Sequence, residues 1–352
     1  MPKVLLFANT DWYLYNFRLA LAKELRAQGY EVILLSPPGE FQNLLQENGF
    51  QWMPFPLSRQ GINPINELGT VWRLMRVYRQ VRPDLVHHFT VKPVIYGSLS
   101  AHLLGIKGII NSITGLGHLF IDPGFITRIL RGLAKTLYRA NLRRTQVIFE
   151  NPEDRDTFIQ NRLLRPEQTS LILGTGVDVE KFRPVPGDND EPLILFAGRL
   201  LVTKGVSEFV DAARQLRQRG TKARFAIAGT PDPGNPASVS PGQIEEWKRS
   251  GLVEVWGWQD DMPATYARAD IFCLPSYREG VPSALLEACA SGLPIVATDV
   301  PGCRDVVSHG VNGLLAPPRD AQALANAIEG LLSDPSLRDR MGQAGRRIAV
   351  EK

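Results

Sequence analysis

The chain has 352 residues, of which 44% are hydrophobic and 22% charged, so a disordered or collagen-like polypeptide is excluded and two globular domains are expected. Residues 1–170 carry 20 Lys and Arg against 13 Asp and Glu (+7), which leaves 40 − 20 = 20 against 36 − 13 = 23 (−3) in the remainder. Only the N-terminal half is therefore expected to meet an anionic surface. The three cysteines lack metal-ligand spacing, and no apolar segment is long enough to cross a bilayer.

Short apolar segments alternate with helical patterns through the first half of the chain. The predicted strands lie near 3–9, 31–36, 84–89, 108–113 and 145–151, and the predicted helices lie near 15–29, 40–48 and 93–104. Strands that are apolar throughout and separated by helices are typical of a parallel sheet that is covered on both faces.

A segment rich in Pro, Gly and Asp, PVPGDNDEP (184–192), follows and marks the predicted domain boundary. The pattern then begins again, with strands expected near 193–199, 223–229, 253–258, 270–276, 294–299 and 313–318. We therefore predict an α/β protein with two tandem Rossmann-like domains, 1–185 and 186–352. Their parallel sheets should face a central cleft in which a ligand binds.

Charged residues follow several strands of the second domain. Arg199 comes just after one strand and Lys204 begins the next helix, and two fixed cations near helical amides suit a diphosphate. Glu279 and Glu287 flank the start of another helix, where they could simply complement the helix dipole. They could also accept hydrogen bonds from sugar hydroxyls. Cations for a diphosphate and carboxylates for sugars together indicate a nucleotide-sugar ligand.

Several linked motifs of the second domain resemble the retaining GT-B glycosyltransferases of family GT4. They are GRLLVTKG (198–205), SYREG (276–280), EGVPSALLE (279–287) with its E-x7-E spacing, and GVNGLLAPP (310–318). The resemblance is strong over residues 193–320 and looser before them. It implies a GT-B fold and metal-independent transfer of a sugar with retention of configuration.

The resemblance also implies roles for particular residues. Arg199 and Lys204 would hold the donor diphosphate, Glu287 the nucleotide ribose, and Glu279 the transferred sugar. The expected donor-binding set is Arg199, Lys204, Trp258, Glu279, Gly280, Val281, Ser283 and Glu287. Trp258 enters this set because an aromatic ring at a strand end can stack on a nucleobase, although such a ring is more often simply packed. The expected catalytic set is His118, Arg199, Lys204 and Glu279.

The first domain resembles a subgroup with lipid-linked acceptors, through SITGLGHLF (112–120) and FRLAL (17–21). It departs from the wider family where Thr-x-His-Gly is usual, since Ser112-Ile113-Thr114-Gly115 stands there and His118 follows. The expected acceptor-side residues are Asn9, Thr10, Thr114, Gly117 and His118. Family members usually end with a helix that crosses back to the first domain, whereas this sequence ends at RRIAVEK, so that helix is expected to be missing.

Residues 125–144 form a predicted helix without an acidic residue. Its cations, Arg128, Arg131, Lys135, Arg139 and Arg143, fall on one stripe. The stripe could merely face water while the apolar side packs on the sheet. It could equally hold the protein on anionic lipid, at about 1 kcal/mol per cation. The expected location is therefore cytoplasmic, peripherally on the inner face of the cell membrane.

The function predicted from these features is transfer of a sugar from a UDP-sugar to a polyprenyl-diphosphate-linked glycan. No cofactor, metal or nucleic-acid partner is expected, since DND (188–190) lies in the linker and Asp260 and Asp261 are better placed to begin a helix. The alternatives are another nucleotide-sugar enzyme on the same fold, such as an epimerase, and a non-enzymatic protein that binds anionic surfaces.

Overall fold

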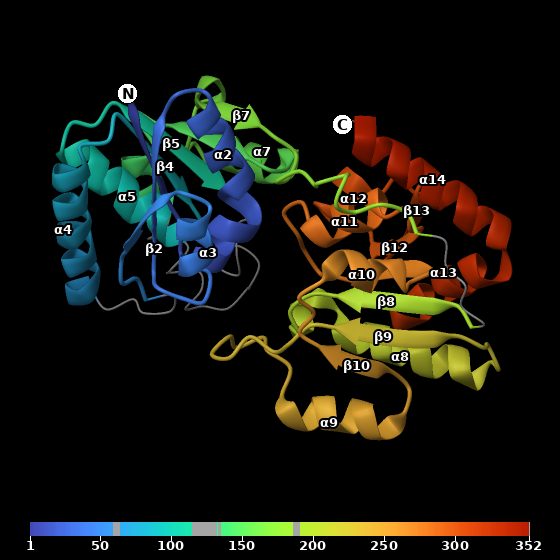
Figure 1. Ribbon diagram of the computed structural model, residues 1–352. Helices are drawn as coiled ribbons and strands as arrows, with labels where there is room; N and C mark the ends of the chain where they lie inside the picture. Colours follow the sequence, from blue (N-terminus) through green and yellow to red (C-terminus); the bar gives the residue numbers. More distant parts are fainter. Residues whose placement is uncertain (59–63, 115–131, 133–134, 186–190, 352) are drawn as a thin grey trace. The chain divides into compact units, whose positions relative to one another are not determined.

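The computed structural model describes residues 1–58, 64–114, 132, 135–185 and 191–351. The chain forms two compact units, Met1–Thr175 and Gly176–Lys352, here called unit 1 and unit 2 (Figure 1). The division falls ahead of the predicted boundary at 185/186. The reason is that Val177, Val179 and Phe182 already pack with the core of unit 2.

Unit 1 contains a seven-stranded sheet in the order β3-β2-β1-β4-β5-β6-β7. The strands are β1 (Lys3–Phe7), β2 (Glu31–Ser36), β3 (Gln51–Pro54), β4 (Leu85–Phe89), β5 (Gly108–Ile113), β6 (Gln146–Phe149) and β7 (Thr169–Leu171). All neighbouring strands are parallel. The predicted parallel sheet is therefore confirmed, and the carboxyl ends of its strands share one edge.

Alternate residues of the central strands supply two separate cores, one on each face of this sheet. Leu5 and Phe7 of β1 pack in one core, whereas Val4 and Leu6 pack in the other. Because both faces are covered, every position of such a strand gains from being apolar, which explains the continuous apolar segments in the sequence.

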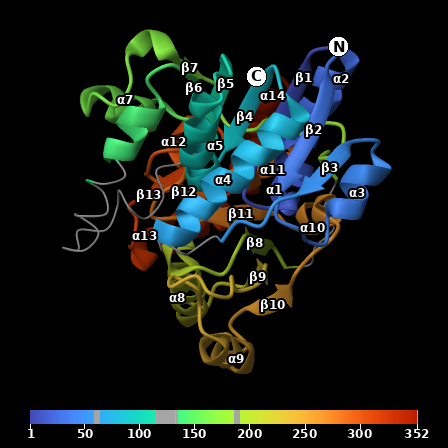
Figure 2. The same cartoon turned by 90° about the vertical axis from the view of Figure 1, so that its left-hand side faces the viewer.

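Helices cover both faces of the unit 1 sheet. They are α1 (Asp11–Tyr13), α2 (Leu19–Ala27), α3 (Gln42–Glu47), α4 (Pro64–Val81), α5 (Val91–Leu103) and α7 (Pro152–Gln160), with a π-helical turn at Leu14–Arg18 and a 3-10 turn at Pro166–Gln168. Helices α4 and α5 lie side by side on one face, as Figure 2 shows. Residues 135–141 are also helical.

Unit 2 contains a six-stranded sheet in the order β10-β9-β8-β11-β12-β13. The strands are β8 (Leu193–Ala197), β9 (Arg224–Ala228), β10 (Glu254–Gly257), β11 (Ile271–Leu274), β12 (Ile295–Thr298) and β13 (Gly313–Ala316). Numbered within the unit, this order is 3-2-1-4-5-6, which is the order of a Rossmann fold. The first six strands of the unit 1 sheet follow the same order.

The helices of unit 2 alternate with its strands. They are α8 (Val206–Gln218), α9 (Pro241–Ser250), α10 (Met262–Ala267), α11 (Ser283–Ala290), α12 (Cys303–Val306), α13 (Ala321–Ser333) and α14 (Pro335–Glu351), with a 3-10 turn at Val202–Lys204. Asp261 begins α10 as predicted, because its side chain accepts a hydrogen bond from the Ala264 amide. The last helix, α14, packs against α11 within the unit.

Candidate functional site

The predicted donor residues lie just beyond the carboxyl ends of the strands of unit 2. Arg199 follows β8, Trp258 follows β10, and Glu279 lies in the loop after β11. These strands are neighbours or near neighbours in the sheet. Side chains that are distant in sequence therefore gather at the edge where ligands of parallel α/β sheets bind.

Lys204 and Glu279, which belong to two different motifs, form a direct ion pair. The Lys204 Nζ atom donates a hydrogen bond to Glu279 Oε1 at 2.5 Å, and both side chains are largely buried, at 22% and 10% exposure. Gly205 explains how the two loops come so close. It has φ +71°, and a Cβ atom there would lie 2.0 Å from the Pro275 carbonyl oxygen. Only glycine allows this approach of one backbone to the other.

Arg199 is also paired with a carboxylate. Its Nη1 atom donates to Asp232 Oδ2 at 2.7 Å. The guanidinium is 56% exposed, whereas Asp232 is only 11% exposed. Asp232 is fixed in turn, because its own amide donates to Ser238 Oγ at 3.1 Å. This carboxylate follows β9 and was absent from the predicted set, although its position in the GTPDPGNP loop after an apolar strand was a usable signal.

Glu287 has quite different surroundings from Glu279. It lies on α11 and is largely enclosed, and burial raises the pKa of its carboxyl from 4.5 to about 7. A hydrogen bond with Tyr266 and the charge of Lys181 act in the opposite direction. The E-x7-E spacing thus places one carboxylate on a cation and the other in an enclosed site where burial raises its pKa.

The remaining donor-side residues form the turn that leads into α11. The Gly280 carbonyl oxygen would lie 1.5 Å from a Cβ atom on Gly302, so the turn is pressed against the residue before α12. The Val281 side chain is 8% exposed and packs in the core of unit 2, which leaves its backbone as the part available to a ligand. Ser283 is the first residue of α11, where free helix amides favour an anion.

Trp258 is the aromatic residue of the predicted donor set. It is 52% exposed, and its Nε1 atom donates to Asp260 Oδ1 at 2.7 Å. Trp256 differs, because its ring is covered by the Arg268 guanidinium at 3.6 Å. Of the two, Trp258 therefore offers a ring face to a base.

Three of the five predicted acceptor residues are described, and all three follow strands of unit 1. Asn9 and Thr10 follow β1, and Thr114 follows β5. Thr10 caps α1, since its Oγ1 atom accepts a hydrogen bond from the Tyr13 amide at 3.1 Å. Gly117 and His118 lie outside the described residues. The sequence did not single out Tyr13, Arg18 or Glu150, which form a buried cluster at the same edge.

The predicted basic stripe of residues 125–144 is only partly described. Arg128 and Arg131 lie outside the described residues. Lys135 Nζ donates to Asn161 Oδ1 at 2.7 Å, and Arg139 Nη2 donates to the Asn161 carbonyl at 3.1 Å. Both cations are therefore held at the C-terminal end of α7, where the helix dipole favours positive charge, and do not extend freely.

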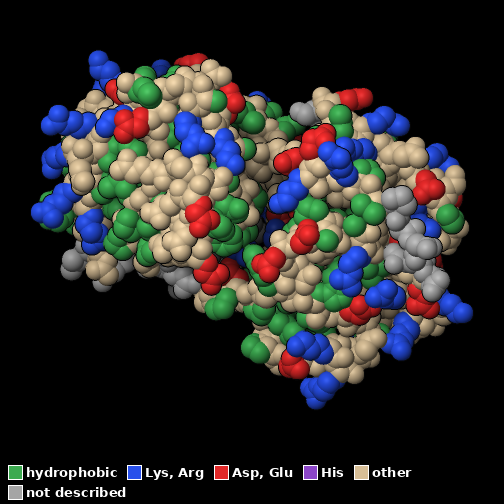
Figure 3. Space-filling model, in the orientation of Figure 1, with side chains coloured by type: hydrophobic (Ala, Val, Ile, Leu, Met, Phe, Trp, Pro, Cys, Tyr) green, Lys and Arg blue, Asp and Glu red, His purple; other side chains and the backbone are tan. Residues whose placement is uncertain are grey.

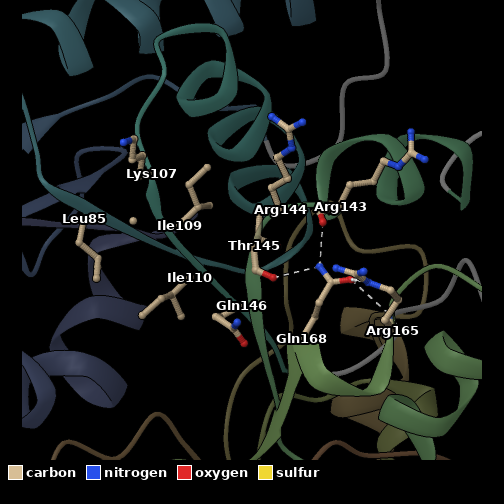
Figure 4. A pocket seen from close by; sticks show the side chains of 11 residues that line it. Leu85, Lys107, Ile109, Ile110, Arg143, Arg144, Thr145, Gln146, Arg165 and Gln168 are labelled. Carbon is tan, nitrogen blue, oxygen red and sulfur yellow. Dashed lines mark hydrogen bonds between the residues drawn. The ribbon is translucent and has the colours of Figure 1, made fainter.

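Arg143 instead borders a cavity of about 440 Å³ at the amino ends of β4, β5 and β6. Figure 4 shows Lys107 on one side of this cavity and the arginines Arg143, Arg144 and Arg165 on the other. Gln168 fixes the wall, since its Nε2 atom donates to the Leu142 and Arg143 carbonyls. The cavity thus lies at the edge of the sheet opposite to Thr114.

The described residues contain no group of three or more His, Cys, Asp or Glu side chains that could hold a metal ion. Among the described helices, none has both the length and the apolar character needed to span a membrane.

The family models for glycosyl transferases group 1 and for glycosyl transferase 4-like proteins match residues 178–348 and 3–151. A Campylobacter jejuni N,N'-diacetylbacillosaminyl-diphospho-undecaprenol alpha-1,3-N-acetylgalactosaminyltransferase is 30% identical, over 96% of this chain and 91% of its own. The chain belongs to the group 1 glycosyltransferases. The Escherichia coli UDP-Gal:alpha-D-GlcNAc-diphosphoundecaprenol alpha-1,3-galactosyltransferase is 25% identical over 80% of this chain and 75% of its own.

Solved structures agree with this assignment at the level of the fold. Anabaena HepE in complex with UDP and glucose has a TM-score of 0.79 and 21% identity, and covers 99% of this chain and 94% of its own. Sucrose-phosphate synthase from Thermosynechococcus elongatus has a TM-score of 0.80 and 21% identity, and covers 100% of this chain and 94% of its own. The predicted GT-B fold of this group 1 glycosyltransferase is confirmed.

Proposed function

We propose that this glycosyltransferase moves a sugar from a UDP-sugar to a glycan linked through a diphosphate to a polyprenyl lipid, with retention of configuration. The observation that carries the proposal is the pair of cations at the carboxyl edge of unit 2: Arg199, which follows β8, and Lys204, which contacts Glu279 in the loop ahead of α11. The two relatives named above act on acceptors with the same diphospho-undecaprenol group, according to their names.

The chemistry follows from the charges at this edge. A nucleoside diphosphate brings negative charge that can compete with Glu279 for Lys204 and with Asp232 for Arg199. Both cations can then stabilise the charge that develops on the departing diphosphate. Glu279, released from Lys204, can accept a hydrogen bond from the transferred sugar, and Glu287 from the ribose. No metal is needed in this scheme.

Isothermal titration of UDP tests the donor site without knowledge of the sugar. Arg199→Gln/Lys204→Gln should weaken UDP binding by about 100-fold, because two charge-assisted contacts are worth about 1.4 kcal/mol or more each. The matched control, Arg214→Gln/Lys222→Gln, removes two cations elsewhere in unit 2. Equal affinities for the two double variants would contradict the proposed site.

Turnover tests the acceptor. The wild-type protein is incubated with α-D-GlcNAc-diphosphoundecaprenol and with UDP-galactose or UDP-N-acetylgalactosamine, and the lipid product is identified by mass. Anomeric retention is then established by NMR of the released glycan. Transfer to free GlcNAc that is as efficient as transfer to the lipid-linked acceptor would contradict the lipid-diphosphate part of the proposal.

We further propose that the protein binds peripherally to the inner, cytoplasmic face of the cell membrane through the basic cavity and the predicted basic stripe of residues 125–144, of which Arg143 lines the cavity. Lys107, Arg143 and Arg144 have no acidic partner among the described residues, whereas Arg165 lies 3.1 Å from Glu167. Lys and Arg side chains also gather over α4, at the left of unit 1 in Figure 3. Such cations suit the phosphates of anionic lipids.

Vesicle co-sedimentation tests this association. Binding to vesicles with 30% phosphatidylglycerol should fall about 30-fold in Arg143→Gln/Arg144→Gln, at about 1 kcal/mol for each of the two cations. The control variant Arg214→Gln/Arg249→Gln loses two arginines of unit 2 and should bind like the wild type. Equal binding to uncharged phosphatidylcholine vesicles would contradict an electrostatic mechanism.

A further inference from the structure

The loop after β1 leads into an unusual helical turn. Residues Leu14–Arg18 form a π-helical turn between α1 and α2. Such turns are rare and occur frequently at functional sites, and their i→i+5 hydrogen bonds bring side chains five positions apart onto one face. Here those side chains are Tyr13 and Arg18, and the Arg18 Nη2 atom donates a hydrogen bond to the Tyr13 hydroxyl at 2.5 Å.

Arg18 connects Tyr13 to a buried carboxylate. The same Nη2 atom donates to Glu150 Oε1 at 3.2 Å, and the two side chains are 11% and 7% exposed. The guanidinium also lies over the Phe89 ring, at 4.5 Å from its centroid. Burial raises the pKa of the Glu150 carboxyl, although the Arg18 charge lowers it. The cluster is therefore tightly held, with little freedom for the guanidinium to move.

This cluster lies among the carboxyl ends of four strands. Tyr13 comes from the helix after β1, Phe89 ends β4, and Glu150 directly follows β6. Thr114, which follows β5, donates a hydrogen bond from its hydroxyl to the Tyr13 oxygen; burial raises the pKa of this phenol, and that hydrogen bond acts to lower it. The Tyr13 hydroxyl thus lies at the predicted acceptor edge of unit 1.

The backbone at this edge is strained as well. Thr90, which follows Phe89, has φ +71° and ψ 165°, a conformation that a β-branched residue rarely adopts. Its Oγ1 atom and the Nε atom of Arg18 are both buried without a hydrogen-bond partner among the described residues. Strain and unpaired polar atoms both cost stability, and they gather at sites where a ligand is bound.

A purely structural role for the cluster is the competing explanation. However, an ion pair that is buried gains little stability over a well-packed apolar replacement. What Arg18 and Glu150 do provide is orientation. Because a guanidinium can only donate, it occupies an electron pair of the Tyr13 oxygen and directs the phenol proton away from itself.

We propose that the Tyr13 hydroxyl donates a hydrogen bond to a hydroxyl oxygen of the acceptor sugar, and that Arg18 and Glu150 are positioning residues that act through Tyr13. The inference rests on the proposed function, since it assigns a ligand to the acceptor edge of the same enzyme. The ligand class is a sugar hydroxyl of a diphosphate-linked glycan, and no bond is made or broken by Tyr13.

The test uses α-D-GlcNAc-diphosphoundecaprenol in detergent micelles as the acceptor probe, with both its binding and its turnover measured. Tyr13→Phe removes only the hydroxyl and should raise the acceptor KM and Kd about five- to tenfold, while UDP affinity stays within twofold of the wild type. Tyr15→Phe is the matched control. This phenol lies two residues away, packs against Phe41, and should change neither value.

A double-mutant cycle then separates positioning from folding. Glu150→Gln should raise the acceptor KM in the wild-type background, but not further in the Tyr13→Phe background, because its effect passes through the phenol. Equal KM increases in the two backgrounds would overturn the positioning role. Melting temperatures of all variants show whether unfolding explains a loss, and Arg18→Lys, which keeps the charge, replaces any variant that does not fold.

Failure of this inference is distinguishable from failure of the proposed function. If the wild type binds UDP and the probe but Tyr13→Phe binds the probe equally well, the role of Tyr13 is refuted and the glycosyltransferase proposal stands. If the wild type binds UDP but not the probe at millimolar concentration, both the acceptor assignment and the role of Tyr13 are refuted.

Discussion

The Lys204 Nζ atom donates a hydrogen bond to Glu279 Oε1 at 2.5 Å, although the two residues lie 75 positions apart in the sequence. One is the expected partner of the donor diphosphate and the other of the donor sugar. Each therefore satisfies the charge of the other, and under the proposed function the donor would separate them on binding.

This pairing predicts that the two residues respond differently to substitution. Glu279→Gln should leave UDP affinity unchanged or slightly tighter, because Lys204 is released for the diphosphate. It should nevertheless lower kcat by at least about 100-fold, through loss of a contact to the transferred sugar. Calorimetry with UDP and a transfer assay measure the two effects. In the control variant Glu329→Gln, which breaks the ion pair with Arg219 elsewhere in unit 2, neither should change.

Glu287 predicts a loss of stability as the pH rises from acid to neutral. Its pKa rises from 4.5 when exposed to about 7 in the folded state, so folding favours the protonated form. The stabilisation is complete below pH 4.5 and is lost as the pH rises to about 7. It amounts to about 3 kcal/mol, at about 1.4 kcal/mol per pKa unit. Urea unfolding at pH 5 and pH 8 should show this loss in the wild type, and Glu287→Gln should reduce it. An identical pH dependence in both proteins would be inconsistent with the enclosed carboxyl.

His88 predicts the opposite behaviour in unit 1. It is hydrogen-bonded to Asn111 and to the Tyr78 hydroxyl, each at 2.8 Å, and burial lowers its pKa from 6.5 to about 4. Folding therefore favours the neutral ring, and the stabilisation is lost as the pH falls from 6.5 to about 4. The loss is about 3 kcal/mol. The free energy of unfolding of His88→Gln, measured by fluorescence across this pH range, should not show the corresponding decrease as the pH falls.

Gly302 and Gly310 offer a controlled test of the turn before α11. Both have φ +78°, a value that alanine rarely adopts, so the substitution strains the backbone at either position. Only at Gly302 does a Cβ atom meet a neighbour, the Gly280 carbonyl oxygen, whereas nothing lies within 4 Å at Gly310. Gly302→Ala should therefore destabilise the protein by about 2 kcal/mol more than Gly310→Ala, and should also weaken UDP binding. Denaturant melts and calorimetry provide both values, and equal destabilisation would argue against the close contact.

The sequence predicted the parts of the fold that burial controls. The central strands, such as β1 and β8, are apolar throughout because both faces of each sheet are covered. The edge strands β3 and β7 were not predicted, since their residues are largely half-buried or exposed and form no apolar segment. Helix α4 was missed as well, because Trp72 and Leu68 are exposed and blur its amphipathic pattern.

The sequence motifs predicted which residues belong to the site, but not the contacts between those residues. Arg199, Lys204, Glu279 and Glu287 were found through their positions after strands and through the family resemblance. That Lys204 pairs with Glu279, or Arg199 with Asp232, depends on loops brought together by glycine contacts that no spacing rule describes. The Tyr13–Arg18 contact was equally hidden, because it needs a π-helical turn and a sequence pattern of 3.6 residues does not reveal one.

Arg346, on the last helix, donates hydrogen bonds from one nitrogen to the carbonyls of Val179, Phe182 and Ala290. The first and last segments of unit 2 are thus fastened by a residue that is synthesised 164 positions after Phe182. Unit 1 ends at Thr175 and can fold while translation of unit 2 continues. Unit 1, which carries the proposed acceptor edge, should accordingly mature first, and unit 2 should complete its packing only after Arg346 has left the ribosome.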